Sequence, residues 1–165
     1  MMFVLTAVAL LLLAAAALYL LLASPGDAAR VPTDQQLDPE LLEATLREAG
    51  VEVGATQTPD TAILREYIGA DDDFIDAVQA KRNSKQAILV LLGDRLVIGE
   101  STLGSMGAEV HVIPLESITD FEQTYDIGGV YTIECGDHSF RYSHIPRSRT
   151  RDFAGQLGER LEPAV

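Results

Sequence analysis

The stretch AILVLLGDRLVI, residues 87–98, decides the fold of this chain. Its first half is an unbroken apolar run that ends at Leu92. The pair Gly93-Asp94 then suits a tight turn, and apolar residues resume at Leu96. A short apolar run between turn residues is typical of a fully buried strand. The stretch therefore predicts a buried antiparallel hairpin.

Further short strands follow the hairpin, because apolar and polar residues keep alternating. Phe121 alternates with its acidic neighbours, and Phe140 and Tyr142 are expected to point inward from the last strand. With the hairpin included, the pattern predicts a mainly β (α+β) domain of about six or seven antiparallel strands. The later strands are expected at 109–113, 119–125, 130–135 and from 138 to the break at Pro146, with turns at 114–117, 126–129 and 136–137.

Helical spacing appears on both sides of these strands. Asp38 and Pro39 suit the start of a helix that ends near Gly50, and we expect it to pack on its own domain or on a partner chain. Its apolar face includes Leu41, Leu42 and Leu46. Two more helices are expected at 61–68 and 73–81, the second with the acidic run 71–73 at its first turn.

A closing helix is expected at about 148–161, where Phe153, Leu157 and Leu161 recur at every fourth residue. Gly155 and Gly158 each cost a helix about 1 kcal/mol relative to alanine. We interpret these two glycines as points of close approach between the helix and the sheet.

This order of elements resembles the bacterial pleckstrin-homology-like (PH-like) domains, which are related in shape to the GRAM domain. The similarity covers about residues 60–161. It is carried by EYIGAD at 66–71, by the hairpin at 88–98, by VIPLESITDF at 112–121 and by the closing helix. In the family the hairpin turn usually holds a threonine and one or two basic residues, whereas here Leu92 replaces the threonine and only Arg95 is basic.

The resemblance implies a bent, partly open β-barrel that is closed at one end by the C-terminal helix. It also implies a binding or scaffolding module and not an enzyme, so we expect no catalytic residue, no cofactor and no metal. We therefore divide the chain into four parts. These are a transmembrane helix (2–23), a linker (24–37), a juxtamembrane helix with a linker (38–58) and the PH-like domain (59–165).

Residues 2–23 contain no Asp, Glu, Lys, Arg or His. As a helix they would be about 33 Å long, enough to cross a hydrocarbon core of about 30 Å. The alternative, a cleaved signal peptide, is disfavoured because no basic residue precedes the run, the run is too long, and residues 23–29 offer no clean cleavage site. Arg30 on the C-terminal flank favours a single-pass protein of the cell membrane whose domain is cytoplasmic.

The composition narrows the partner classes. The formal net charge of −13 repels phosphate backbones, so nucleic acid is not an expected partner. The one cysteine, Cys135, cannot form an intramolecular disulfide and agrees with a reducing compartment. We expect the membrane, through residues 2–23, and a protein to be the partners.

The motifs that could carry chemistry are incomplete. The glycines of residues 99–104 have the spacing of a phosphate loop, but the lysine that would contact the phosphates is missing. His111, His138 and His144 have no ligand partners at metal-site spacing, and we expect them to be partly exposed on strands.

One charged feature stands out in this acidic chain. Four of its 12 basic residues lie within eleven positions, at Arg141, Arg147, Arg149 and Arg151. Near an anionic leaflet each arginine could contribute about 1 kcal/mol of binding. The sequence therefore leaves three hypotheses: a module that binds a protein partner, a domain that reads anionic lipid headgroups through these arginines, and an accessory subunit of a membrane enzyme or transporter.

Overall fold

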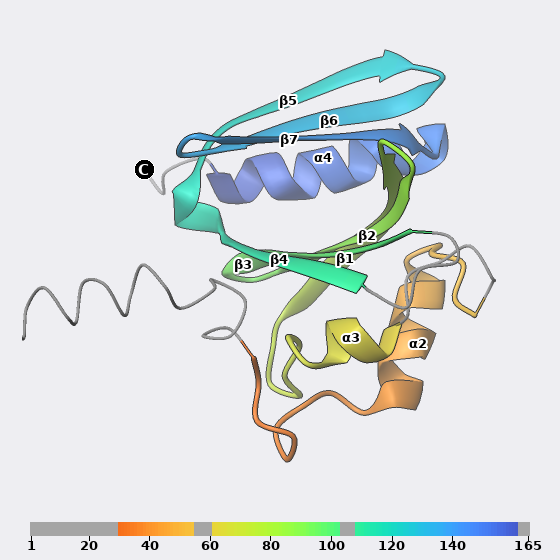
Figure 1. Cartoon of the computed structure of the whole chain (residues 1–165), viewed down its shortest axis with the longest axis vertical. Helices are drawn as coiled ribbons and strands as arrows, with labels where there is room; N and C mark the ends of the chain where they lie inside the picture. Colours follow the sequence, from red (N-terminus) through yellow and green to blue (C-terminus); the bar gives the residue numbers. More distant parts are fainter. Residues whose placement is uncertain (1–29, 55–60, 103–107, 162–165) are drawn as a thin grey trace, which may run out of the picture.

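The computed structural model describes residues 30–54, 61–102 and 108–161. These residues form one seven-stranded sheet with two helices before it and one after it (Figure 1). Every pair of neighbouring strands is antiparallel, in the order β4-β3-β2-β1-β7-β6-β5. The elements are α2 (Pro39–Glu48), α3 (Thr61–Arg65), β1 (Phe74–Arg82), β2 (Lys85–Leu92), β3 (Arg95–Thr102), β4 (Ala108–Pro114), the 3-10 turn η2 (Leu115–Ser117), β5 (Ile118–Asp126), β6 (Gly128–Cys135), β7 (His138–Ile145) and α4 (Arg147–Leu161).

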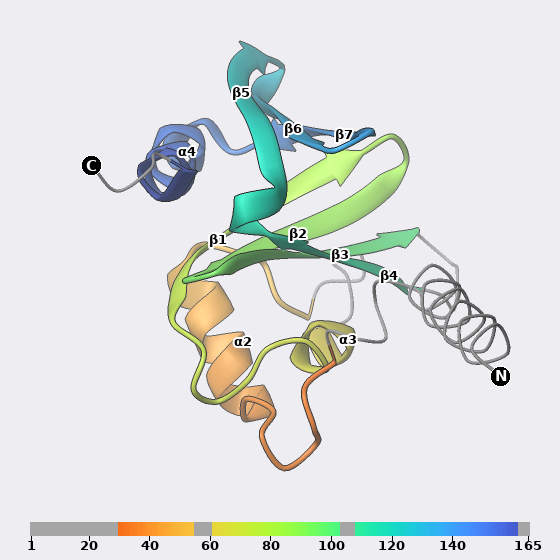
Figure 2. The ribbon, with the colours of Figure 1, turned by 90° about the vertical axis from the view of Figure 1, so that its left-hand side faces the viewer.

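The sheet bends between β1 and β7, where Lys81 and Ser143 are the one registered pair. On either side of this bend the ladders are long, so the sheet divides into a β1–β4 half and a β5–β7 half. Helix α4 lies between the two halves, and α2 and α3 cover the opposite face of β1–β4 (Figures 1 and 2). The mainly β class and the C-terminal helix are confirmed, but the sheet is open and does not close into a barrel.

The inner core fills the space between the two halves and α4. The rings of Tyr131 and Phe153 stack with their centroids 5.7 Å apart, and the Tyr131 hydroxyl donates to the Thr150 carbonyl of α4 at 2.6 Å. The buried residues of this core are Val78, Ala80, Ala87, Leu89, Leu91, Leu96, Ile98, Ile113, Leu115, Tyr131, Ile133, Tyr142, Ile145, Phe153, Ala154 and Leu157.

A second, outer core lies between β1–β4 and the two N-terminal helices. From Ile88 to Leu92, β2 contributes side chains alternately to the two cores, which explains why its apolar run is unbroken. The buried residues of the outer core are Leu42, Leu46, Val51, Leu64, Tyr67, Ile68, Ala77, Ile88, Val90, Leu92 and Val97. Helix α2 therefore packs on its own domain, and of its three leucines only Leu41 stays exposed.

The chain before α2 is also attached to this domain. The Val31 amide donates to the Glu66 carbonyl at 2.7 Å, and the Leu37 amide donates to the Ile68 carbonyl at 2.9 Å. Residues 30–37, which the sequence places in a linker, thus run along the α3–β1 connection. Among the described residues no helix has the length and apolar character needed to cross a membrane. The membrane helix expected at 2–23 lies outside them.

The helix expected at 73–81 is wrong, because these residues form β1. A bulge between Phe74 and Asp76 interrupts the alternation. Ala77 then faces the outer core and Val78 the inner core, so two adjacent apolar residues imitate helical spacing. The acidic run has a different use, since Asp72 accepts from the Gly69 amide at 2.6 Å and pairs with the Arg95 guanidinium at 2.5 Å. Helix α3 lies where expected but ends at Arg65.

The interpretation of the two helix glycines is also wrong. A Cβ atom added at Gly155 or Gly158 would meet no atom within 4 Å. The close approach between α4 and the sheet occurs at a glycine of β6 instead, because a Cβ at Gly129 would lie 2.2 Å from the Thr150 Oγ1. Among the described residues from 85 to 145, the strands begin within two residues of their predicted starts.

These contacts predict opposite effects for two substitutions in α4. Phe153→Ala should lower the free energy of unfolding by about 3–5 kcal/mol, because a ring with no exposed surface is lost from the inner core. Gly155→Ala should raise it by up to about 1 kcal/mol, because the methyl group enters open space on a helix. Urea unfolding of a fragment spanning residues 30–165 measures both, and a loss below about 1 kcal/mol for Phe153→Ala would show that α4 does not complete the core.

Candidate functional site

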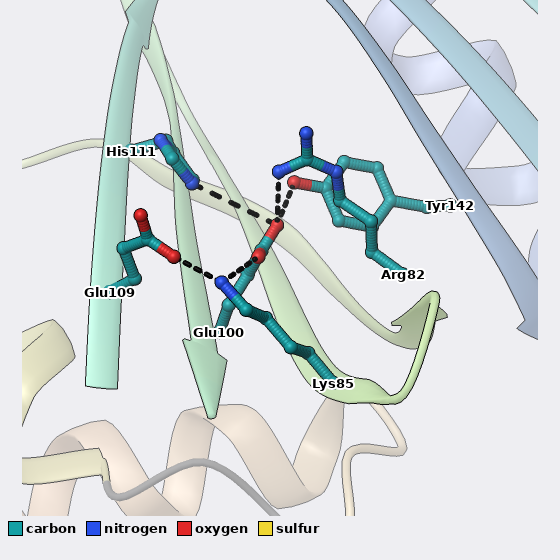
Figure 3. A network of polar contacts seen from close by, with 6 residues as sticks. All are labelled: Arg82, Lys85, Glu100, Glu109, His111 and Tyr142. Atoms are coloured by element: carbon teal, nitrogen blue, oxygen red, sulfur yellow. Dashed lines mark hydrogen bonds and ion pairs between the residues drawn. The ribbon is translucent and has the colours of Figure 1, made fainter. Parts of the chain in front are cut away.

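A cluster of polar side chains closes one end of the inner core. Side chains alternate across a strand, so the residues that follow Leu96 and Ile98 on the inner face of β3 include Glu100. The same alternation brings Arg82 of β1, Lys85 of β2, Glu109 and His111 of β4, and Tyr142 of β7 to this end. We call these six residues the Glu100 cluster (Figure 3).

Glu100 is the centre of the cluster, and its side chain has no exposed surface. Its Oε1 accepts from the Tyr142 hydroxyl at 2.6 Å and from the Arg82 Nη1 at 3.2 Å. The Lys85 Nζ lies 3.4 Å from Oε2. A buried carboxylate is tolerated only when charges and donors surround it, and these three groups supply them.

Aromatic contacts hold the rim of the cluster. The Arg82 guanidinium lies over the Phe140 ring, 5.0 Å from its centroid, and the His111 ring is tilted against the same phenylalanine at 5.3 Å. The His111 Nε2 is 3.9 Å from the Glu100 Oε1, which is too far for a hydrogen bond. Arg82 is therefore fixed both by charge and by its ring contact, whereas His111 is fixed mainly by packing.

The outer part of the cluster is a Lys85–Glu109 ion pair with a direct hydrogen bond. That bond raises the pKa of Lys85 above its ordinary value and lowers the pKa of Glu109 below its own. Both side chains reach solvent, with 34% of Lys85 and 57% of Glu109 exposed. Screening by water therefore keeps the pair weak as a source of stability.

The deeper part of the cluster is chemically different. Burial, and then the hydrogen bond to Glu100, raises the pKa of Tyr142, so the phenol remains a neutral donor to the carboxylate.

Three of the six residues carry atoms that bind metals: a carboxylate oxygen of Glu100, one of Glu109 and a ring nitrogen of His111. These atoms lie within 4.8 Å of one another.

The four arginines singled out in the sequence do not form one patch. Arg141 is exposed on β7, and Arg147 and Arg151 are exposed on α4. Arg149 is partly buried and forms an ion pair with Asp76 of β1. Arg149 thus attaches α4 to the bulge of β1 and is not available to a ligand in the way that its neighbours are.

Two large apolar side chains are exposed at the β5–β6 turn. Tyr125 is 54% exposed and Ile127 is 80% exposed. The turn lies beside the start of α4, since Gly129 pairs with Ile145 and approaches Thr150 closely. We call Tyr125, Asp126 and Ile127 the hairpin tip.

Sequence reasoning missed the Glu100 cluster, although a signal for it exists. Residues 99–104, whose glycines have the spacing of a phosphate loop, begin in β3. A Cβ at Gly99 would lie only 2.8 Å from the Leu64 Cδ2, so this glycine permits close packing. Extending the alternation of Leu96 and Ile98 by one step would have placed Glu100 on the inner face. Sequence alone could not show that five polar residues from β1, β2, β4 and β7 contact or surround Glu100 on this face.

Comparisons with known proteins do not identify a family. No family model matches the chain, and no curated protein matches it. Among solved structures, the C-terminal domain of an unknown protein from Leishmania infantum is similar over 56% of this chain and 88% of that chain, with 13% identity and a TM-score of 0.44. A similarity of this size supports no statement about function.

The geometry at Glu100 predicts how stability depends on Tyr142 and on pH. Tyr142→Phe should lower the free energy of unfolding at pH 8 by about 1–3 kcal/mol, because a buried carboxylate loses its closest donor. Because the pKa of Tyr142 is raised on folding, the stabilisation by the neutral phenol is present below about pH 10 and is lost as the pH rises further. Stability of the wild type should therefore fall above about pH 10, and the fall should be smaller in Tyr142→Phe.

Urea unfolding at about pH 8 and pH 10.5 measures both effects. Arg141→Ala is the matched control, since this exposed neighbour on β7 should change stability by less than about 0.5 kcal/mol. Equal effects of the two substitutions at pH 8, or parallel losses at high pH, would contradict the proposed role of the phenol.

Proposed function

We propose that this chain is a non-enzymatic, membrane-tethered PH-like module that binds a protein partner through the hairpin tip. The PH-like reading is supported by the order of the elements, in which seven antiparallel strands bend into two halves and a C-terminal helix lies between them. The binding role is supported mainly by one observation. The hairpin tip exposes an aromatic and an aliphatic side chain together, next to charged residues of α4.

The chemistry of the tip fits a protein interface. Protein-binding patches place aromatic and aliphatic side chains at the centre and polar groups at the rim. Here Tyr125 and Ile127 are the exposed apolar residues, with Asp126 between them in the sequence. The exposed Arg147 and Arg151 belong to the start of α4, beside the turn. The Gln123 side chain donates to the Tyr125 hydroxyl at 2.7 Å and thereby orients the ring. A centre of this size fits a small, reversible interface.

The position of the tip favours a protein over the lipid of the same membrane. In both views the tip lies at the opposite end of the molecule from residues 30–37 (Figures 1 and 2). The expected membrane helix ends at residue 23, and the intervening residues could span at most about 25 Å when fully extended. Since residues 30–37 are hydrogen-bonded to the domain, the proposed membrane helix would tether the domain at the end opposite the tip.

The other two hypotheses have less support. The lipid-reading hypothesis loses Arg149, which pairs with Asp76, and retains Arg141 on a different element from Arg147 and Arg151. The accessory-subunit hypothesis relied on the leucines of α2 for contact with a partner. Two of these leucines are buried in the outer core of the chain itself.

Photo-crosslinking in native membranes tests the proposed function. A benzophenone amino acid placed at Ile127 of the full-length chain should give a discrete protein adduct, because the side chain is 80% exposed at the tip. The same amino acid at Leu41 is the matched control: Leu41 is 54% exposed but lies on α2. The expected result is a defined adduct from position 127 and none of the same mass from position 41.

Two results would contradict the proposal. Adducts with lipid and not with protein at position 127 would favour the lipid-reading hypothesis. The same hypothesis would be favoured if residues 30–165 bound phosphatidylglycerol vesicles at physiological salt and the double variant Arg147→Ser/Arg151→Ser did not. Identical protein adducts from positions 127 and 41 would show contact without a specific surface at the tip.

A further inference from the structure

We propose that the Glu100 cluster binds one divalent transition-metal ion, represented here by Zn²⁺, through Glu100, Glu109 and His111. This site is independent of the proposed function, because its residues lie on β1–β4 and β7 and not at the hairpin tip. The starting point of the inference is that the three side chains bring two carboxylate oxygens and one imidazole nitrogen within 4.8 Å of one another.

Two polar atoms of these residues are buried without a hydrogen bond. Among the described residues, neither the Glu100 Oε2 nor the His111 Nε2 has a hydrogen-bond partner, although both are shielded from solvent. Buried polar atoms without a hydrogen bond are uncommon. The Glu100 Oε2 has an ion-pair contact, with the Lys85 Nζ at 3.4 Å, but no hydrogen bond. Here both atoms belong to the same cluster, and the Glu100 side chain is completely buried.

The donor set agrees with this choice of ion. Imidazole and carboxylate ligands together suit Zn²⁺ and neighbouring transition metals, whereas Ca²⁺ and Mg²⁺ prefer oxygen ligands alone. Ligands about 2.0–2.1 Å from a tetrahedral ion are about 3.3 Å apart, so the three atoms must move together by about 1.5 Å at most. The exposed side chain of Glu109 can supply most of that movement.

Lys85 at present supplies the positive charge that the ion would bring. Its Nζ forms a direct hydrogen bond with the Glu109 carboxylate and lies 3.4 Å from the Glu100 Oε2. The lysine is partly exposed at the β1–β2 turn, so it can leave for solvent when an ion enters. Arg82 and Tyr142 bind the other oxygen of Glu100 and can remain in place. Lys85 and the ion should therefore compete for the same two carboxylates.

Calorimetric titration of the full-length chain in detergent with ZnCl₂ tests the proposal, on protein that carries no histidine tag. Wild type should bind one ion. His111→Gln and Glu109→Gln should each weaken binding at least tenfold, because each removes one ligand. Lys85→Gln should strengthen binding at least threefold, because it removes the competing charge. His138→Gln is the matched control, since His138 lies outside the cluster on β7, and it should leave the affinity unchanged.

The opposite effects expected at Lys85 and Glu109 distinguish a ligand set from a simple ion pair. If the pair were only structural, both substitutions would break it and should act in the same direction. The proposal is overturned if wild type binds no Zn²⁺, if His111→Gln and His138→Gln weaken binding equally, or if Lys85→Gln fails to strengthen it. Circular dichroism of each variant ensures that a loss of affinity is not a loss of fold.

Discussion

The β2–β3 hairpin has apolar side chains on both of its faces, and neither face is stable in water unless another layer covers it. The inner face is covered by α4 and by the bent-over β5–β7 half of the sheet. The outer face is covered by α2 and α3. The order of the layers, α2 with α3, then β1–β4, then α4 and then β5–β7, follows from this one requirement (Figure 1). It also explains why the N-terminal helices belong to the folded unit and do not merely connect it to a preceding segment.

The placement of charge follows from the same geometry. The alternation places Glu100 on the inner face of β3, two residues beyond Ile98, the last apolar residue that β3 contributes to the inner core. A carboxylate without solvent must be surrounded by donors, and Arg82, Lys85 and Tyr142 converge on it for that reason. At the other end of the inner face, α4 is held by the Arg149–Asp76 pair, which leaves the hairpin tip to present its apolar residues to solvent.

The sequence predicts the strands after residue 85 because local alternation and turn residues agree with the final structure there. The sequence does not predict β1, because both faces of this strand are buried and a bulge interrupts its alternation. Ala77 and Val78 therefore have the spacing of one face of a helix. The sequence also fails to separate Arg149 from Arg147 and Arg151, because only the tertiary structure brings Asp76 to α4. The Glu100 cluster could not be predicted from local sequence patterns either. Its residues come from five strands, and their proximity depends on the bend between β1 and β7.

The outer face of the hairpin depends on α2 for its burial. Comparing Leu46→Ala with Leu41→Ala by urea unfolding of residues 30–165 tests this most directly, since the two leucines lie on the same helix and differ in burial. Leu46→Ala should lower the free energy of unfolding by about 2–5 kcal/mol, and Leu41→Ala should change it by less than about 0.5 kcal/mol. Equally small losses for both variants would contradict this dependence, because the hairpin would then be stable without its outer layer.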